Sequence, residues 1–342
     1  MPNQPKYKQA FFVLFVLLVC CFFINISLGS VSIPIRGVIN SVFAHSSHES
    51  WTYIIQNYRL PKAVTAILVG SGLGVSGLLM QTLFRNPLAG PFVLGISSGA
   101  SLGVALVILG SGLFGGVFAG ILISKWSVVI AASLGSFLVL LAVLIVSSRV
   151  RDTMAILIIG LMFASITGAI VGVLSYFSSA EQLQRYVFWG FGSLGNLSWQ
   201  ELLVFGLIYS VGLVLSLASV KALNTLLLGE NYAKSLGLHL KRSRLYIILA
   251  TSLLAGTITA FAGPIAFIGL AIPHVARLVF NTSNHKILLP AVVLFGAIIM
   301  LICDTIAQIP NSDYTLPINA ITSLVGAPMV IWLLVRKRNL MF

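Results

Sequence analysis

The chain has 342 residues, of which 58% are hydrophobic and only 8% are charged, and its mean hydropathy is +1.05. Since a soluble domain carries about 25% charged residues, this composition excludes an ordinary soluble enzyme or binding domain. About ten helical spans of roughly 20 to 25 residues each would use most of the length. The sequence therefore predicts an all-α polytopic membrane protein, with residues 1–342 forming a single transmembrane domain.

The net charge of +13 would indicate nucleic-acid binding in a soluble protein, so the positions of the charges matter. With ten spans and a cytoplasmic N-terminus, 15 of the 20 basic residues fall on segments predicted to lie inside. The other five fall outside: Arg36, Arg59, Lys62, Lys125 and Arg185. This bias follows the positive-inside rule. The charges therefore predict an orientation with both termini in the cytoplasm and require no nucleic acid.

Apolar runs predict ten spans. Nine of them are expected at about 10–28, 62–84, 92–110, 126–148, 153–176, 200–219, 245–262, 287–308 and 316–335. The eighth span lies between the ranges 245–262 and 287–308. We interpret the first as a retained span, because its apolar run exceeds the roughly 7 to 15 residues of a signal peptide. Cys20, Cys21 and Cys303 all lie within apolar runs and predict no disulfide framework.

The second and third spans are predicted to be joined by a tight turn. Residues 63–84 carry no charged side chain and are long enough to cross a bilayer core. Pro87 and Pro91 then interrupt the helix, because proline lacks an N–H and disfavours helix in the residue before it. Arg85 and Asn86 are left in the turn.

Four glycines occur along the second span: Gly70, Gly72, Gly74 and Gly77. The last three copy the spacing of a dinucleotide-binding fingerprint, but no strand precedes them. Small residues also allow helices to approach closely in lipid. We therefore interpret these glycines as helix-packing positions.

Two segments between spans carry local patterns. The segment 177–198 is predicted outside, with a short helix in which Arg185 lies one turn after Glu181. The loop 220–244 is the most charged part of the chain. Within it, residues 228–237 predict a short helix bounded by glycines. Its exposed leucines, interleaved with charges, indicate a docking surface.

Asp304 is the only acidic residue within an apolar run of the second half of the chain. An acid inside a membrane is a functional hypothesis by default, because its burial is costly. Asp304 lies near the predicted outer end of its span. We therefore favour a structural hydrogen-bonding role over a functional one.

The sequence has no Gly-Lys-Ser/Thr motif and so no phosphate-binding loop of its own. It also lacks the embedded acid and base chains of a proton-driven pump. A secondary transporter would need ion-coordinating acids, and a membrane-embedded enzyme would need a catalytic cluster. No catalytic residue, cofactor or metal ligand is predicted. These features favour a permease driven by a separate ATPase, with a secondary transporter as the remote alternative.

Several stretches carry a family resemblance. They are Arg59-Leu60-Pro61-Lys62, Asn86-Pro87-Leu88-Ala89, Leu94-Gly95-Ile96-Ser97-Ser98-Gly99-Ala100, and Gly263-Pro264-Ile265 leading to Pro273-His274 and Arg277. This ordered series resembles the iron-siderophore, haem and cobalamin permease family, the membrane subunits of ATP-driven importers. Gly90 stands where the family usually has an acidic residue, and Gln308 where a basic residue is common.

The resemblance implies a partner set and a location. We expect a homodimer in the bacterial inner membrane, with two ATP-binding cassette subunits and a periplasmic or lipoprotein binding protein. The expected cargo is an iron-siderophore, with haem or cobalamin as the alternative. Glycine-proline breaks near Gly90 and Gly263 also predict an inverted repeat of spans 2–5 and 7–10.

The resemblance also implies roles for individual residues. Docking of the binding protein is expected at Arg59 and Lys62, with Arg185 as a further candidate. Coupling to the ATPase is expected in the loop 220–244, at Leu228, Gly229, Glu230, Ala233, Leu236 and Gly237. From position alone, the inner gate or pathway is predicted near Thr153, Met154, Asn86 and Pro87.

Overall fold

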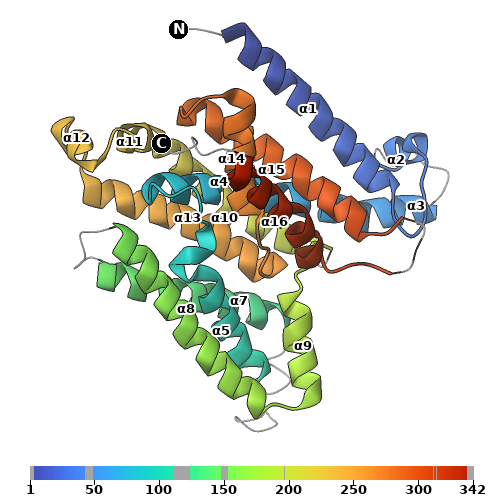
Figure 1. The fold of residues 1–342 in the computed structure, drawn as a ribbon. Coiled ribbons are helices and arrows are strands. Elements are labelled where there is room, and N and C mark those ends of the chain that lie inside the picture. Colours follow the sequence, from blue (N-terminus) through green and yellow to red (C-terminus); the bar gives the residue numbers. More distant parts are fainter. Residues whose placement is uncertain are drawn as a thin grey trace. The chain divides into compact units, whose positions relative to one another are not determined.

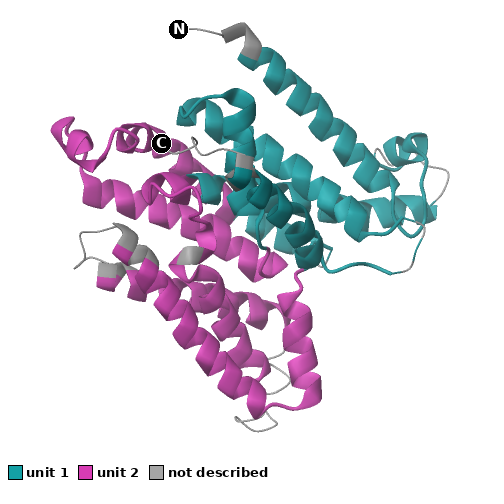
Figure 2. Cartoon of the chain, in the orientation of Figure 1, with its two compact units in different colours: residues 1–78, 193–207, 266–341 teal, residues 79–192, 208–265, 342 magenta. Residues whose placement is uncertain are grey.

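A computed structural model of the protein describes residues 4–42, 49–110, 124–147, 153–195, 197–310, 312 and 314–336. The described chain is helical and divides into two compact units (Figures 1 and 2). Unit 1 comprises residues 1–78, 193–207 and 266–341, and unit 2 comprises residues 79–192, 208–265 and 342. Helices α4 (Leu60–Leu83) and α10 (Trp199–Ala218) each continue from one unit into the other along the chain.

Unit 1 is built around α4 and the C-terminal helices. Its other helices are α1 (Gln4–Ser27), α2 (Ile35–Val42), α3 (Glu49–Ile54), α14 (Ile268–Phe280), α15 (His285–Ala307) and α16 (Ile318–Arg336). Helix α1 packs along α15, and α14, α15 and α16 pack against one another (Figure 1). Phe280 joins α14 to α1, because its ring lies 4.8 Å from that of Phe11.

Unit 2 is also built from helices. Its helices are α5 (Ile96–Ile108), α7 (Lys125–Ser147), α8 (Thr153–Tyr176), α9 (Ala180–Gly190), α11 (Val220–Leu226), α12 (Glu230–Ser235) and α13 (Leu240–Ala262). Helix α5 packs against α7, α8 and α13. Buried small and aliphatic residues of α5, including Ala100 and Val104, form a core cluster with Ala132 of α7 and Ala260 of α13.

The lengths of the helices confirm the predicted polytopic membrane fold. Within the described residues, seven helical segments are long and apolar enough to cross a membrane. Three shorter apolar helices, α5, α14 and α16, occupy the predicted third, eighth and tenth spans. Nine spans begin or end within a few residues of the expected positions. The predicted inverted repeat stays a prediction.

The second span begins earlier than expected. Helix α3, a π-helical turn at Ile55–Arg59 and α4 form one continuous segment from Glu49 to Leu83. Pro61 lies inside this segment, where it removes a hydrogen bond and would crowd the preceding turn. A π-helical turn just before the proline widens the helix at that point. The segment therefore stays helical through the proline.

The third span is shorter than the predicted 92–110. A 3-10 turn at Pro91–Leu94 precedes it, and α5 begins only at Ile96. Between them Gly95 adopts a φ of 73°, in the left-handed region that favours glycine. The proline and the glycine together reorient the chain before α5 and shorten the helix to 13 residues.

The glycines of α4 confirm the helix-packing interpretation. A Cβ added at Gly70 would overlap the carbonyl oxygen of Gly296 on α15, and the reverse is also true. A Cβ at Gly77 would overlap the carbonyl oxygen of Gly269 on α14. Close backbone contact of this kind is possible only where both helices present small residues. These glycines hold α4 against α14 and α15.

Candidate functional site

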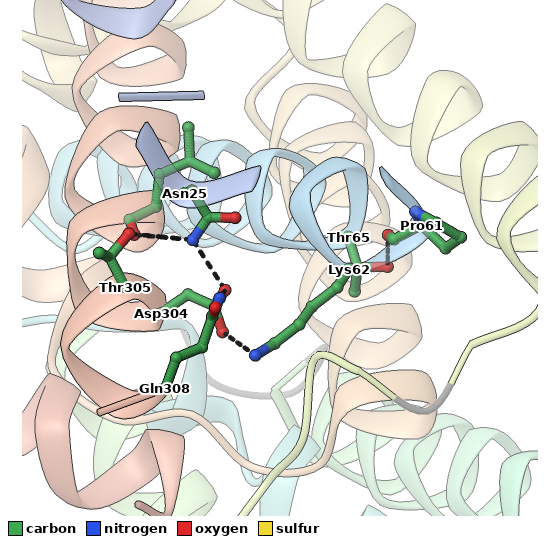
Figure 3. A network of polar contacts seen from close by, with 8 residues as sticks. Asn25, Pro61, Lys62, Thr65, Asp304, Thr305 and Gln308 are labelled. Atoms are coloured by element: carbon green, nitrogen blue, oxygen red, sulfur yellow. Dashed lines mark hydrogen bonds and ion pairs between the residues drawn. The ribbon is translucent and has the colours of Figure 1, made fainter. Parts of the chain in front are cut away.

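In unit 1, the predicted docking residue Lys62 lies beside Asp304, which is 2% exposed (Figure 3). The ammonium nitrogen of Lys62, on α4, lies 3.1 Å from Oδ1 of Asp304. Oδ2 of Asp304 accepts a hydrogen bond of 2.9 Å from Asn25 and one of 2.7 Å from Gln308. The carboxylate thereby joins α1, α4 and α15. We call Asn25, Lys62, Asp304 and Gln308 the Asp304 network.

Each member of the Asp304 network has a physical reason to be there. A buried carboxylate needs a cation and several donors to replace its lost hydration. Lys62 supplies the cation and remains 22% exposed, while its aliphatic carbons lie against Gly195. Gln308, one helical turn after Asp304, supplies an amide donor. The predicted hydrogen-bonding role of Asp304 is confirmed.

Arg59 also makes internal contacts at the same end of unit 1. Its Nη1 donates hydrogen bonds to the carbonyl oxygens of Ile26 (2.7 Å) and Ser27 (3.0 Å), and its Nη2 donates to that of Val31. The last carbonyl groups of a helix have no partner within the helix. A cation there is also favoured by the helix dipole. Arg59 therefore caps α1.

Arg185 differs from the two other predicted docking residues. It lies on α9, where its guanidinium is 2.7 Å from the carboxylate of Glu181, as expected from the spacing of the two residues. The side chains are 48% and 74% exposed. Helix α9 begins with a capping box formed by Ser179 and Gln182. Of the three residues, Arg185 presents the most accessible charge.

In unit 2, the predicted coupling helix is present as α12. It is bounded by Gly229 (φ 98°) and Gly237 (φ 83°), both in backbone conformations that favour glycine. Leu228, Tyr232 and Leu236 are about three-fifths exposed. We call these three exposed residues, which lie on α12 and at its two ends, the α12 surface.

Helix α12 is attached to the rest of unit 2 by few contacts. Ala233 is its only buried residue. Glu230, at its first position, accepts a hydrogen bond of 2.6 Å from Arg244, on the second turn of α13. Arg85 lies close as well, since a Cβ added at Gly229 would be 3.6 Å from its guanidinium. The N-terminal end of α12 is therefore held by basic side chains.

The predicted gate residues are only partly described. The side chains of Thr153 and Met154, at the start of α8, lie outside the described residues. Asn86 accepts a hydrogen bond of 2.9 Å from the N–H of Leu88, which stabilises the turn that contains Pro87. Asn86 and Pro87 thus shape the turn, and their role in a gate stays a prediction.

Sequence reasoning missed two partnerships in these sites. It placed Glu230 and Arg244 in one loop but did not pair them, and it did not connect Lys62 with Asp304. A spacing rule identifies Glu181 and Arg185 because they lie one turn apart on one helix. The other two pairs form only when separate helices pack, so no local pattern reveals them.

These features define an all-helical, multi-pass membrane protein with a short helix and exposed apolar side chains between two of its spans. Residues 17–336 match the FecCD transport family, and the chain belongs to this family. It is 35% identical to the hemin transport system permease protein HmuU of Yersinia pestis, over 98% of this chain and 97% of that protein. It is also 35% identical to the vitamin B12 import system permease protein BtuC of Klebsiella pneumoniae, over 98% and 96%.

Solved structures agree with this assignment. The chain is similar to the structure of a protein described as a metal-chelate type ABC transporter, in an inward-facing conformation. The TM-score is 0.83 at 31% identity, over 96% of this chain and all of that one. PsaBC from Streptococcus pneumoniae shares the fold, with a TM-score of 0.57 at 17% identity. The protein is therefore a permease of the ABC importer class, which confirms the resemblance seen in the sequence.

Proposed function

We propose that the chain is the membrane subunit of an ATP-driven importer that carries an iron-siderophore or a related metal chelate across the bacterial inner membrane. The observation that carries this proposal is the α12 surface, three exposed side chains on α12 and at its two ends, in a segment between spans. Such a surface serves a protein partner, because exposed apolar clusters mark interaction sites. The working unit would be two copies of the chain, two ATPase subunits and a binding protein, with both termini cytoplasmic.

The identity of the cargo has one alternative within the same family. The names of two relatives, a hemin permease and a vitamin B12 permease, favour haem or cobalamin. The experiment is uptake into vesicles containing the complete complex, with a ferric siderophore, hemin and cyanocobalamin compared at equal concentration. Preferential ATP-dependent uptake of the siderophore supports the proposed cargo. Preferential uptake of hemin or cyanocobalamin replaces it, and ATP-independent uptake contradicts the class of mechanism.

ATPase docking at the α12 surface can be tested separately. Leu236→Asp places a charge in the apolar surface and should prevent co-purification of the ATPase subunit. Lys234→Ala is the matched control, since it changes a charged residue of the same helix outside that surface. Normal co-purification with Leu236→Asp would show that the ATPase binds elsewhere.

Docking of the binding protein is proposed at Arg59, Lys62 and Arg185. Arg59 and Lys62 have internal partners, so reversing their charges would also disturb α1 and Asp304. Arg185→Glu is the cleaner test, because Arg185 is exposed. We expect weaker capture of the binding protein at low salt, where exposed charges act most strongly. Arg36→Glu reverses another exposed charge on the predicted outer side and serves as the control.

The gate is proposed at Thr153, Met154, Asn86 and Pro87. ATP binding would shift the complex between outward-open and inward-open states by favouring one of them. Cysteines introduced at Thr153 and Met154 should react with a thiol reagent at rates that change when ATP is bound. Rates that do not respond to ATP would exclude these two positions from the gate.

A further inference from the structure

Helix α12 has few contacts with the rest of unit 2, and its one ion pair among the residues that the structure describes lies at its first residue, Glu230. Its single buried residue is Ala233, which contributes little more than a methyl group. A helix of six residues has little stability of its own, because nucleating a helix is costly. The direction in which α12 points is therefore set by contacts with other elements. Apolar burial alone provides too few such contacts to fix it.

The preceding helix α11 is anchored much more firmly. Val220, Leu223 and Leu226 are all buried there, so one whole face of α11 is packed. Between the two helices lies Gly229, and after α12 lies Gly237, which has no neighbouring atoms where a Cβ would be. Hinges form at a few such residues that absorb changes of backbone angle. Helix α12 is thus a short helical segment between two glycines.

One polar contact connects this segment to a membrane span. The carboxylate of Glu230 lies 2.6 Å from the guanidinium of Arg244 on α13. The side chains are 32% and 19% exposed, so water screens the pair less than it screens a surface pair. Arg244 lies on the second turn of a helix of 23 residues. A displacement of α12 at this contact therefore acts directly on the end of α13.

We propose that the Glu230–Arg244 ion pair is the mechanical link that transmits movement of a partner docked on α12 to the membrane span α13. Glu230 and Arg244 are positioning residues that fix the angle of α12 and pass its displacement on. The inference rests on the proposed function, because it requires an ATPase subunit docked on the α12 surface. Removing the pair leaves α12 joined to α13 through the short segment 236–239, and leaves the α12 surface available for docking.

The test separates docking from transmission. Glu230→Gln and Arg244→Gln each remove one charge, and wild type and variants are purified with the ATPase subunit and reconstituted in vesicles. The measured quantities are co-purified ATPase, ATP hydrolysis, and ATP-dependent uptake of whichever of a ferric siderophore, hemin or cyanocobalamin the wild type imports. We expect normal co-purification and a fall of about fivefold in uptake per ATP hydrolysed. A change of this size is typical of the coupling energy between two residues in contact.

Three further variants exclude a general structural effect. Arg242→Ala removes an exposed basic residue of the same turn that has no ion pair within the described part of the chain, and should leave uptake per ATP within about twofold. The double variant of Glu230→Gln with Arg244→Gln should be no worse than either single variant. Exchange of the two charges, by Glu230→Arg with Arg244→Glu, should restore part of the uptake per ATP.

The possible outcomes distinguish the inference from the function on which it rests. If the wild type neither binds an ATPase subunit nor imports any of the three cargoes, the proposed function fails. If the wild type works and the charge-neutralised variants match it in uptake per ATP, the inference is overturned. Loss of ATPase binding in those variants also overturns it, since the pair would then serve docking. Normal docking with reduced uptake per ATP, partly restored by the exchange, supports it.

Discussion

Helices α4 and α8 look alike in sequence and differ in the environment of their glycines. Gly70 and Gly77 of α4 face backbone carbonyl groups of α15 and α14 within unit 1. Gly168 and Gly172 of α8, in unit 2, have no atoms within 4 Å of where a Cβ would be. Glycine therefore accompanies close packing at Gly70 and Gly77 of α4 and open space at Gly168 and Gly172 of α8. Small residues permit close approach, and only the neighbouring helices determine whether it occurs.

The largest effect is expected for Gly77→Ala, which tests the packed side of this comparison. The added methyl group would overlap the carbonyl oxygen of Gly269, a backbone atom that cannot rotate away. Helix α14 would have to move, and overpacking of this kind should cost about 3 kcal/mol or more in free energy of unfolding. The measurement is unfolding by SDS in mixed micelles.

Gly168→Ala is the matched control for Gly77→Ala, since it makes the same change where there is space. Alanine also has the higher helix propensity, so stability should be unchanged or rise by up to about 1 kcal/mol. Equal losses in the two variants would break the comparison. They would mean that α8 is as closely packed as α4.

Gly99→Ala sharpens the comparison within unit 2. Gly99 of α5 meets Gly135 of α7 in a reciprocal backbone contact, and a Cβ there would also lie 2.9 Å from that of Val139. We expect a smaller loss than at Gly77, about 2 kcal/mol, because a Cβ at Gly99 would lie 2.4 Å from the carbonyl oxygen of Gly135, whereas at Gly77 it would lie 1.5 Å from that of Gly269. The same SDS titration measures it. Tolerance equal to that of Gly168→Ala would show that α5 and α7 can separate without cost.

Much of the fold follows from local sequence. The ends of α8 and α15 were predicted to within two residues, because an apolar run must fill the bilayer and its flanks are polar. The glycine-bounded α12 was predicted for a similar reason, since Gly229 and Gly237 interrupt the helix on either side. Pro91 and Gly95 also lie in the sequence, but their combined shortening of α5 depends on the backbone angles that they adopt.

The candidate sites were less predictable because their contacts join distant segments. From the family resemblance, Arg59 and Lys62 were expected to offer their charges to a binding protein. In the structure the charge of Lys62 neutralises Asp304, and Arg59 caps α1. Both contacts depend on how α1, α4 and α15 pack. The sequence carries the residue types, and their pairing emerges only from tertiary structure.

Lys62→Met extends the comparison from glycines to charges. The variant retains most of the apolar contact with Gly195 and leaves the carboxylate of Asp304 buried without its cation. Loss of one partner of a fully buried pair costs about 3 to 5 kcal/mol, and the partial exposure of Lys62 reduces our expectation to about 2 kcal/mol. SDS unfolding again provides the measurement.

Lys286→Met is the control for Lys62→Met, because it removes an exposed cation of unit 1 that has no ion pair within the described ranges. Its effect should stay below about 0.5 kcal/mol. Addition of Asp304→Asn to Lys62→Met should recover part of the lost stability, since the buried charge is then absent. A failure of this second change to recover stability would show that packing, and not charge, explains the loss.

The smallest effect on stability is expected for Glu181→Gln, because the Glu181–Arg185 pair is exposed whereas Asp304, the partner of Lys62, is buried. Glu181 is 74% exposed, so its contact with Arg185 is screened by water and should contribute less than about 0.5 kcal/mol to stability. The substitution also frees Arg185. If Arg185 docks an acidic binding protein, capture of that protein at low salt should become slightly tighter while the SDS unfolding curve stays the same.

Two outcomes would contradict this expectation. A clear loss of stability would place the Glu181–Arg185 pair with Lys62 and Asp304 among the structural contacts. Unchanged capture of the binding protein would leave Arg185 without a docking role. The burial of an ion pair, rather than its presence, thus decides whether its charge is available to a partner.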